Sequence, residues 1–211
     1  MRENPDYAMT DPAEVRALIR EHPWATMVSA TEAGVVVSHY PFLLEEAPPG
    51  SGTDELVLVS HVGRPDERAH RLGESEIAIV FQGPHGYVSP SWYGVAQAVP
   101  TWNFAAVHAY GVPEILSDAE NLAVLERLVD HFEDAMPDPF RLRITPENAA
   151  YAERIVHGTV GFRLRVKRLE AKEKMSQDKP DEVVERITTA LEAPGPYRHP
   201  ALAERIRRAR P

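Results

Sequence analysis

Alternating apolar and polar positions predict short strands, and apolar residues at helical spacing predict helices. The expected strands cover residues 24–30, 35–44, 55–61, 76–82, 101–116 and 160–167, and the fifth is bent near residues 111–113. The expected helices begin near residues 11, 65, 117, 145, 179 and 199. This order of elements favours an α+β fold, an antiparallel barrel with helices packed outside it.

Turn and cap residues predict where several of these elements begin or end. Glu32-Ala33-Gly34 separates the first two strands and predicts a hairpin. Ser117 and Glu120 have the spacing of a capping box. The helix after them is expected to bury Leu122, Leu125, Val129 and Phe132. The Pro- and Gly-rich stretch 45–54 predicts an exposed loop.

Aromatic residues concentrate in two stretches, Gln82–Tyr93 and Val99–Phe104, which also contain Pro, Gly and hydroxyl residues. Core strands tolerate little Pro, so the first stretch is expected to be a bent loop that contains His85. The Trp and Tyr rings of both stretches, with the amide of Asn103, suit a planar and partly polar ligand. Aromatic packing at a subunit interface explains the same residues equally well.

Charge and composition exclude several classes of function. The chain has 211 residues, with 32 acidic and 23 basic side chains and a formal net charge of −9, which disfavours broad electrostatic binding to DNA. It contains no Cys, which excludes disulfides, a thiolate nucleophile and Cys-ligated metals. No signal peptide is recognisable and no apolar run is long enough to span a bilayer, so a cytoplasmic protein is expected.

Histidine would bind a metal or heme iron in a chain without cysteine. The sequence contains 9 His, but no two have the spacing of a zinc site. His61 is the strongest candidate, because it closes a strand just before Gly63 and Arg64, where the next helix begins. Arg64 is a candidate anion clamp. A hydrogen-bonded structural role for any single His, and a turn-capping role for Arg64, are the alternatives.

A basic strand face leads into a short polar loop. Arg163 and Arg165 alternate with apolar residues, and the following residues continue into Lys174–Asp178. The side chains of this loop, including Gln177, can reach the polar edge of a ligand. An ordinary solvated basic face is the alternative.

Several motifs of this chain resemble those of the PaiB-type family, whose members are usually labelled FMN-binding negative transcriptional regulators. The motifs are Pro84–Tyr93, Val99–Phe104 with Val107-His108, Lys174–Gln177, Ala25–Ser29, His39 with Pro41, and His61 with Arg64. They occur in the family's order along nearly the whole chain. Two stretches depart from the family pattern. Asp66-Glu67 stands where Asn-Pro is usual, and Asp178 stands where Asn is usual.

The resemblance implies a mainly antiparallel split β-barrel with peripheral helices, related to the pyridoxamine-phosphate oxidases. It also implies a homodimer with the cofactor, FMN or heme b, at the subunit interface. Residues 1–175 are expected to form the cofactor-binding domain, and residues 176–211 a helical extension packed on it. The residues expected to bind the cofactor are His61, Arg64, His39, Ser89, Ser91, Trp92, Trp102, Asn103 and Gln177.

One branch of this barrel family is similar to heme-dependent piperazate synthases, which close an N–N bond in N5-hydroxy-ornithine. In such an enzyme a neutral His would bind the heme iron, and residue type and loop position make His61 the first choice and His39 the second. On the same grounds, Lys174 or Tyr93 is expected to assist proton transfer. We therefore expect an enzyme that acts on a small molecule, and the acidic net charge favours it over a DNA-binding protein.

Two other functions are compatible with the same motifs. The first is an FMN-binding oxidoreductase in which Arg64, Ser89 and Ser91 hold the phosphate. The second is a transcriptional regulator that senses the cofactor and contacts DNA through the basic tail around Arg205 and Arg208.

Overall fold

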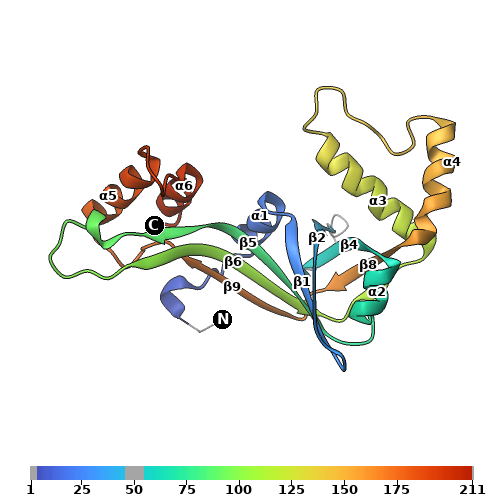
Figure 1. Ribbon diagram of the computed structural model, residues 1–211, viewed down its shortest axis with the longest axis horizontal. Helices are drawn as coiled ribbons and strands as arrows, with labels where there is room; N and C mark the ends of the chain where they lie inside the picture. Colours follow the sequence, from blue (N-terminus) through green and yellow to red (C-terminus); the bar gives the residue numbers. More distant parts are fainter. Residues whose placement is uncertain (1–3, 46–54, 211) are drawn as a thin grey trace. The chain divides into compact units, whose positions relative to one another are not determined.

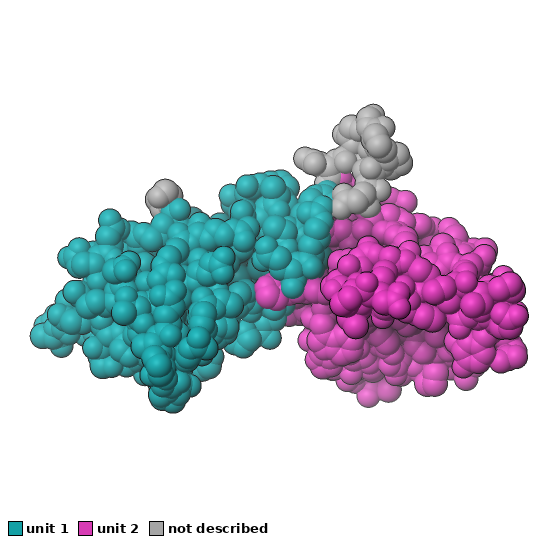
Figure 2. All heavy atoms as spheres, turned by 90° about the horizontal axis from the view of Figure 1, so that it is seen from above, with its two compact units in different colours: residues 1–21, 82–107, 170–211 teal, residues 22–81, 108–169 magenta. Residues whose placement is uncertain are grey.

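The computed structural model describes residues 4–45 and 55–210. The chain forms two compact units, which Figure 2 colours separately. Unit 1 comprises residues 1–21, 82–107 and 170–211, and unit 2 comprises residues 22–81 and 108–169. The loop expected at 45–54 lies outside the described residues except for Glu45.

Unit 2 contains two antiparallel sheets (Figure 1). In one, β1 (Trp24–Thr31) pairs with β2 (Gly34–Pro41) and with the first part of β5 (Ile77–Val88). The other has the strand order β3 (Leu43–Leu44), β4 (Val57–Gly63), β8 (Thr159–Arg165) and β7 (Glu114–Ile115). The register pairs His61 of β4 with Gly161 of β8.

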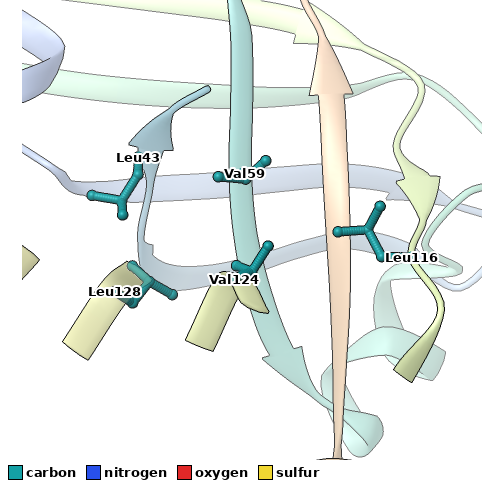
Figure 3. Close-up of a cluster of buried hydrophobic side chains, with 5 residues drawn as sticks. All are labelled: Leu43, Val59, Leu116, Val124 and Leu128. Carbon is teal, nitrogen blue, oxygen red and sulfur yellow. The ribbon is translucent and has the colours of Figure 1, made fainter. Parts of the chain in front are cut away.

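The helices of unit 2 are α2 (Arg64–His70), α3 (Asp118–Glu133), α4 (Pro146–Ile155) and the short η3 (Val156–Gly158). Ser117 and Glu120 form the predicted capping box at the start of α3. Side chains from α3 pack against the β3–β4–β8–β7 sheet in a buried cluster of Leu43, Val59, Leu116, Val124 and Leu128 (Figure 3). Burial of these apolar side chains stabilises the layer of helix on sheet.

Unit 1 contains the remaining parts of β5 and of β6 (Thr101–Gly111), and most of β9 (Arg168–Lys174). These strands are neighbours in the order β5-β6-β9. Its helices are η1 (Pro5–Tyr7), α1 (Pro12–Glu21), η2 (Pro90–Trp92), α5 (Asp181–Glu192) and α6 (Pro200–Arg208). Figure 1 shows α5 and α6 together on one side of the strands. The boundary expected at residue 175 stays a prediction.

The α+β class with antiparallel sheets agrees with the sequence prediction, but three local expectations are wrong. The strand expected at 76–82 continues to Val88 as β5, so His85 lies on a strand and not in a loop. The polar segment 168–174 forms β9, which the sequence pattern did not predict. Helix α3 buries Leu122, Val124 and Leu128, and it leaves Phe132 47% exposed.

No helix within residues 4–45 and 55–210 has the length and the apolar character that crossing a bilayer requires.

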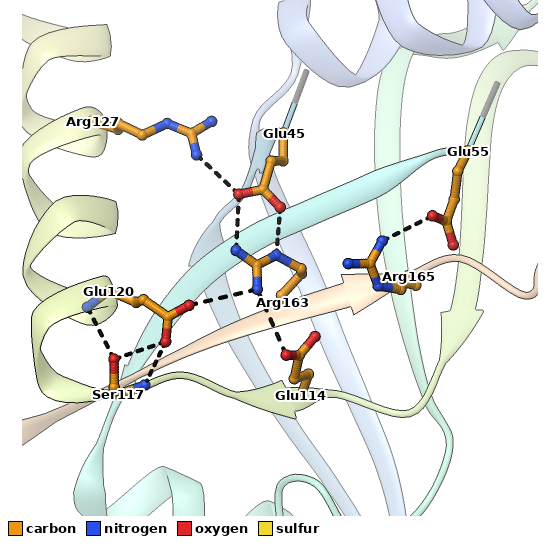
Figure 4. Close-up of polar contacts among 8 residues, drawn as sticks. All are labelled: Glu45, Glu55, Glu114, Ser117, Glu120, Arg127, Arg163 and Arg165. Carbon is orange, nitrogen blue, oxygen red and sulfur yellow. Dashed lines mark hydrogen bonds and ion pairs between the residues drawn. The ribbon is translucent and has the colours of Figure 1, made fainter. Parts of the chain in front are cut away.

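Arg163 on β8 is the centre of an ion-pair network in unit 2 (Figure 4). Its guanidinium donates two hydrogen bonds to the carboxylate of Glu45, and Glu114 and Glu120 lie within 4.0 Å of it. The side chains of Arg163 and Glu45 are only 18% and 27% exposed, so solvent screens this pair weakly, whereas Glu114 and Glu120 are more than half exposed. Hydrogen bonding to Arg163 lowers the pKa of Glu45 against the opposing effect of burial.

Replacing Arg163 with alanine is expected to lower the free energy of unfolding by about 2 kcal/mol, because the Glu45 carboxylate loses its charged donors in a half-buried setting. Urea denaturation measures this loss. Arg165 is the matched control: it lies on the same strand, pairs with Glu55 at 2.9 Å and is 49% exposed. Arg165→Ala is expected to cost less than about 1 kcal/mol. Equal losses in the two variants would contradict the special role of Arg163.

Candidate functional site

His61 presents a buried nitrogen that has no hydrogen-bond partner within residues 4–45 and 55–210. It lies near the end of β4, where the chain passes through Gly63 into α2. Its Nδ1 atom is buried and accepts or donates no hydrogen bond among the described residues. Burial lowers the pKa of His61, so the imidazole is neutral at pH 7. A buried polar atom without a partner lowers the stability of the fold by about 1–3 kcal/mol, and a ligand that bonds to this nitrogen would remove that cost.

Tyr40 lies beside His61 and is fixed by Asp66. The Tyr40 ring meets the His61 ring edge to face, with centroids 6.3 Å apart. The Tyr40 hydroxyl donates to Asp66 and accepts from the backbone N–H of Gly63 at 3.4 Å. Burial, followed by the hydrogen bond to Asp66, raises the pKa of Tyr40 and keeps its hydroxyl protonated. Asp66, which departs from the family motif, therefore holds the junction between β4 and α2.

Arg64 is the first residue of α2 and lies next to Gly63 at the same junction. Its Nε donates to the carbonyl oxygen of His157 at 2.5 Å, and His157 Nδ1 lies 2.8 Å from Asp118 Oδ2. Among the residues that the structure describes, no carboxylate forms an ion pair with Arg64. The guanidinium thus keeps its charge available for an anion.

His39, the second candidate ligand, has a different environment. It lies on β2 opposite Thr26 and is exposed. Its ring stacks on Trp24 with centroids 6.5 Å apart and an angle of 15° between the planes. Both rings have an aromatic neighbour, but the His39 ring is exposed whereas Nδ1 of His61 is buried. The described residues contain no group of three His, Asp or Glu that would hold a metal ion without a prosthetic group.

His70 is a buried histidine that the sequence analysis did not single out. It is fully buried at the end of α2, with Nδ1 2.8 Å from Ser29 Oγ and Nε2 3.0 Å from Ser38 Oγ. These bonds tie α2 to β1 and β2, and so support the helix that begins at Arg64. The two partners, Ser29 and Ser38, lie 41 and 32 residues from His70 along the chain. The local sequence therefore carries no signal for this role.

The pKa of His70 predicts how stability depends on pH. Burial lowers this pKa from its usual value of 6.5, and Asp66 opposes the shift. The unfolded chain therefore binds a proton at a pH where folded His70 stays neutral. The contribution of neutral His70 to the free energy of unfolding is complete above about pH 6.5 and is lost as the pH falls below that value. Urea denaturation at a series of pH values is expected to show this decrease.

His70→Gln is expected to flatten the decrease of stability below about pH 6.5. The matched control is His131→Gln, because His131 is exposed on α3. That variant is expected to keep the wild-type dependence on pH. If the two variants had the same profile as the wild type, the assignment to His70 would be wrong.

The other predicted site residues belong to unit 1, and the loop after β9 is held by its own side chains. Asn103 is fully buried and its Nδ2 donates to Ser176 Oγ at 2.9 Å. Gln177 accepts from the N–H of Met175 at 2.6 Å and donates to the carbonyl of Glu173 at 2.7 Å. These bonds stabilise a turn in which Ser176 has a φ of +62°.

Ser89, Ser91, Trp92 and Lys174 also have partners inside unit 1. Ser89 Oγ lies 2.7 Å from Ser91 Oγ and accepts from the Ser91 N–H, which caps η2. Lys174 donates to the hydroxyl of Thr101. The Trp92 ring meets the Tyr197 ring at 6.3 Å.

Tyr93 and Trp102 contrast in exposure. Tyr93 is 5% exposed, and its hydroxyl has no hydrogen-bond partner within the described part of the chain. Burial is the first cause that raises its pKa, so the hydroxyl is protonated and can donate. Trp102 is 57% exposed and meets the Tyr87 ring at 6.3 Å. The structure thus groups His39, His61 and Arg64 in unit 2, and the remaining predicted residues in unit 1.

Comparison with known proteins identifies the family. Residues 1–168 match the family described as "Putative FMN-binding domain". The chain belongs to this family. One relative is "Protease synthase and sporulation protein PAI 2" of Bacillus subtilis, 28% identical over 176 residues, which cover 82% of this chain and 80% of that protein.

Two solved structures are similar to this chain in fold. The flavocytochrome Anf3 from Azotobacter vinelandii matches with a TM-score of 0.57 at 16% identity, over 79% of this chain and 69% of that chain. The FAD and heme binding protein from Mycobacterium smegmatis matches with a TM-score of 0.55 at 18% identity, over 83% and 78% of the two chains. The predicted split-barrel fold class is confirmed.

Proposed function

We propose that this protein binds heme through His61 and is an enzyme that acts on a small molecule. The observation that carries the proposal is the neutral, buried imidazole of His61, whose Nδ1 has no partner among the described residues. Axial ligation of heme iron uses a neutral imidazole nitrogen. The names of two proteins with the same fold, a flavocytochrome and an FAD and heme binding protein, support this choice of cofactor.

The proposed reaction is closure of an N–N bond in N5-hydroxy-ornithine. The α-amino nitrogen forms a bond to N5, the N–O bond breaks and water leaves, so the reaction needs no external oxidant. When bound, the heme would supply a Lewis acid for the N–OH group. His61 would hold the prosthetic group at the end of β4, and Tyr40, fixed by Asp66, would orient the His61 ring. Lys174 and Tyr93 stay the predicted proton-transfer residues.

FMN is the second candidate cofactor, favoured by the description of the matched family. Arg64 supports it, because its guanidinium pairs with no carboxylate among the described residues and suits a phosphate. Ser89 and Ser91 already bond to each other, so their hydroxyls would have to rearrange to accept a phosphate.

Reconstitution of the purified protein separates these cofactors. Titration with hemin is expected to give a saturating Soret band at one heme per chain, whereas FMN is expected to keep its free fluorescence. The loaded protein is then incubated with N5-hydroxy-ornithine, and mass spectrometry follows the loss of one water. Quenching of FMN with no hemin uptake would support the flavin protein instead. If heme binds but no product forms, the proposed heme site stands and the proposed reaction is wrong.

We also propose that the protein forms the homodimer implied by its family. The hairpin of β1 and β2 exposes an apolar face: Trp24, Val35 and Val37 are 64%, 71% and 53% exposed. The register places Val35 opposite Ala30 and Val37 opposite Val28, and the polar pair Thr26 and His39 separates these residues from Trp24. Clusters of exposed apolar side chains are typical of protein interfaces.

Val37→Lys is expected to convert the dimer to a monomer, because a buried lysine would have no partner in an apolar contact. Light scattering coupled to size-exclusion chromatography measures the mass. The control is Val112→Lys, since Val112 has the same exposure of 53% but lies between β6 and β7. A wild-type monomer, or a Val37→Lys dimer, would contradict the interface.

A further inference from the structure

We propose that a cleft of unit 1 binds a planar aromatic carboxylate that carries a ring N–H. The cleft has a volume of about 420 Å³, and the lining residues that recognise the ligand are His85, Tyr87, Trp102, Tyr197, Arg198 and His199. All of them belong to unit 1, so the site is complete within this unit. Its volume lies in the range of pockets that take small organic molecules.

Three aromatic rings from distant parts of the chain form the apolar wall. Tyr87 lies on β5, Trp102 on β6, and Tyr197 between α5 and α6. The Tyr87 ring centroid lies 5.1 Å from that of Tyr197 and 6.3 Å from that of Trp102. Trp102 and Tyr197 nevertheless remain 57% and 50% exposed. The exposed parts of these two rings offer surface on which a flat ligand can stack.

Two histidines give the cleft one acceptor and one donor. His85 Nδ1 lies 3.0 Å from the carbonyl oxygen of Gly83, which only accepts, so Nδ1 carries the proton and Nε2 of the neutral ring is an acceptor. His199 Nδ1 accepts from the N–H of Leu202 at 3.3 Å, so its Nε2 carries the proton and donates. A ligand N–H matches the first nitrogen, and a carboxylate matches the second.

The charge of the cleft selects an anion. None of the described residues that line it is Asp or Glu, although the chain has 32 acidic side chains. Arg198 lines the cleft and forms no ion pair with any carboxylate in the described ranges. The guanidinium of Arg198 and the imidazole N–H of His199 belong to adjacent residues. Together they offer charge-assisted hydrogen bonds to one carboxylate.

Backbone contacts hold the wall of the cleft in place. The N–H of His199 donates to the carbonyl of Leu191 at 2.7 Å, which closes the segment that contains Tyr197 and Arg198. Gly86 lies against α6, where a Cβ atom would come within 2.8 Å of the Leu202 side chain. The site is thus preformed, which lowers the entropic cost of binding.

This inference goes beyond the proposed function, because it uses neither His61 nor a prosthetic group. Isothermal titration calorimetry with indole-3-acetate tests it on the full-length protein. Indole-3-ethanol is the uncharged probe of nearly the same shape. We expect saturable binding of indole-3-acetate, about tenfold or more tighter than binding of the alcohol. We expect the same affinity in His61→Ala protein.

Three variants assign the binding to the cleft. Trp102→Ala is expected to lower the affinity for indole-3-acetate about tenfold or more, since one stacking surface is lost. Arg198→Gln is expected to remove the preference for the acid over the alcohol. Trp24→Ala is the control, because Trp24 is an exposed strand tryptophan of unit 2 and is expected to leave binding unchanged. Circular dichroism checks that each variant is folded.

The inference is overturned if the folded protein shows no saturable heat, or if Trp102→Ala and Arg198→Gln bind both probes like the wild type. It is also overturned if Trp102→Ala abolishes hemin uptake, because the aromatic wall would then belong to the heme site. That result would leave His61 as the heme ligand. Conversely, unchanged hemin uptake in His61→Ala with intact indole-3-acetate binding would remove the proposed heme ligand and keep the cleft.

Discussion

Replacing His61 with alanine is expected to abolish heme binding. The variant loses the neutral, buried nitrogen that would ligate iron, and the neighbouring Tyr40 hydroxyl is already bonded to Asp66. Removing a group that only supports a metal ligand typically lowers the affinity for the metal about 10- to 100-fold. The loss of heme affinity in His61→Ala is expected to be larger. Hemin titration followed by the Soret band measures it.

The variant also separates ligation from folding. Without heme, His61→Ala is expected to change the free energy of unfolding by no more than about 1 kcal/mol, because loss of an unpartnered nitrogen offsets the small cavity. His39→Ala is the control, since the His39 ring is exposed and stacks on Trp24. It is expected to bind hemin like the wild type. If His39→Ala lost heme and His61→Ala did not, His39 on β2 would be the iron ligand instead.

The second large effect is expected from Phe42, which joins the sheets of unit 2. Phe42 lies between β2 and β3, and its ring meets Phe81 at 5.9 Å and Phe162 at 5.8 Å, both edge to face. All three side chains are fully buried. Phe42→Ala removes both aromatic contacts and leaves a cavity. It is expected to lower the free energy of unfolding by about 3–5 kcal/mol.

Urea denaturation measures this loss, with Phe132→Ala as the matched control. Phe132 lies on α3 and is 47% exposed, so its removal is expected to cost about 0.5 kcal/mol or less. A loss below about 1 kcal/mol in Phe42→Ala would show that the three rings do not support the core of unit 2.

Local signals in the sequence predicted the elements that begin at turns and caps. Gly34 and the capping box at Ser117 mark the hairpin and α3 where the structure has them. Longer-range contacts decide the elements that were missed. Gly86 interrupts the pattern of β5 because Leu202 of α6 packs against it, and this contact joins residues far apart in the chain. Strand β9 is mostly polar, and its place in the sheet is set by its pairing with β6.

The candidate site was predictable only in part for the same reason. The position of His61 before a strand-to-helix junction was visible in the sequence, but its unpartnered nitrogen depends on burial by residues from other strands. Asn103 was expected as a ligand-facing amide, and the structure pairs it with Ser176, 73 residues away. The hydrogen-bonding capacity of a side chain is local, but the partner that uses it is set by the tertiary fold.

Pulsed electron paramagnetic resonance of the ferric, heme-loaded protein tests the central claim most directly. Protein grown with ¹⁵N-labelled histidine distinguishes a histidine nitrogen on the iron from the unlabelled nitrogens of the porphyrin. We expect a ¹⁵N hyperfine coupling in the wild type that is absent in His61→Ala loaded with excess hemin. A wild-type spectrum without ¹⁵N coupling, or a coupling that persists in His61→Ala, would contradict ligation of the iron by His61.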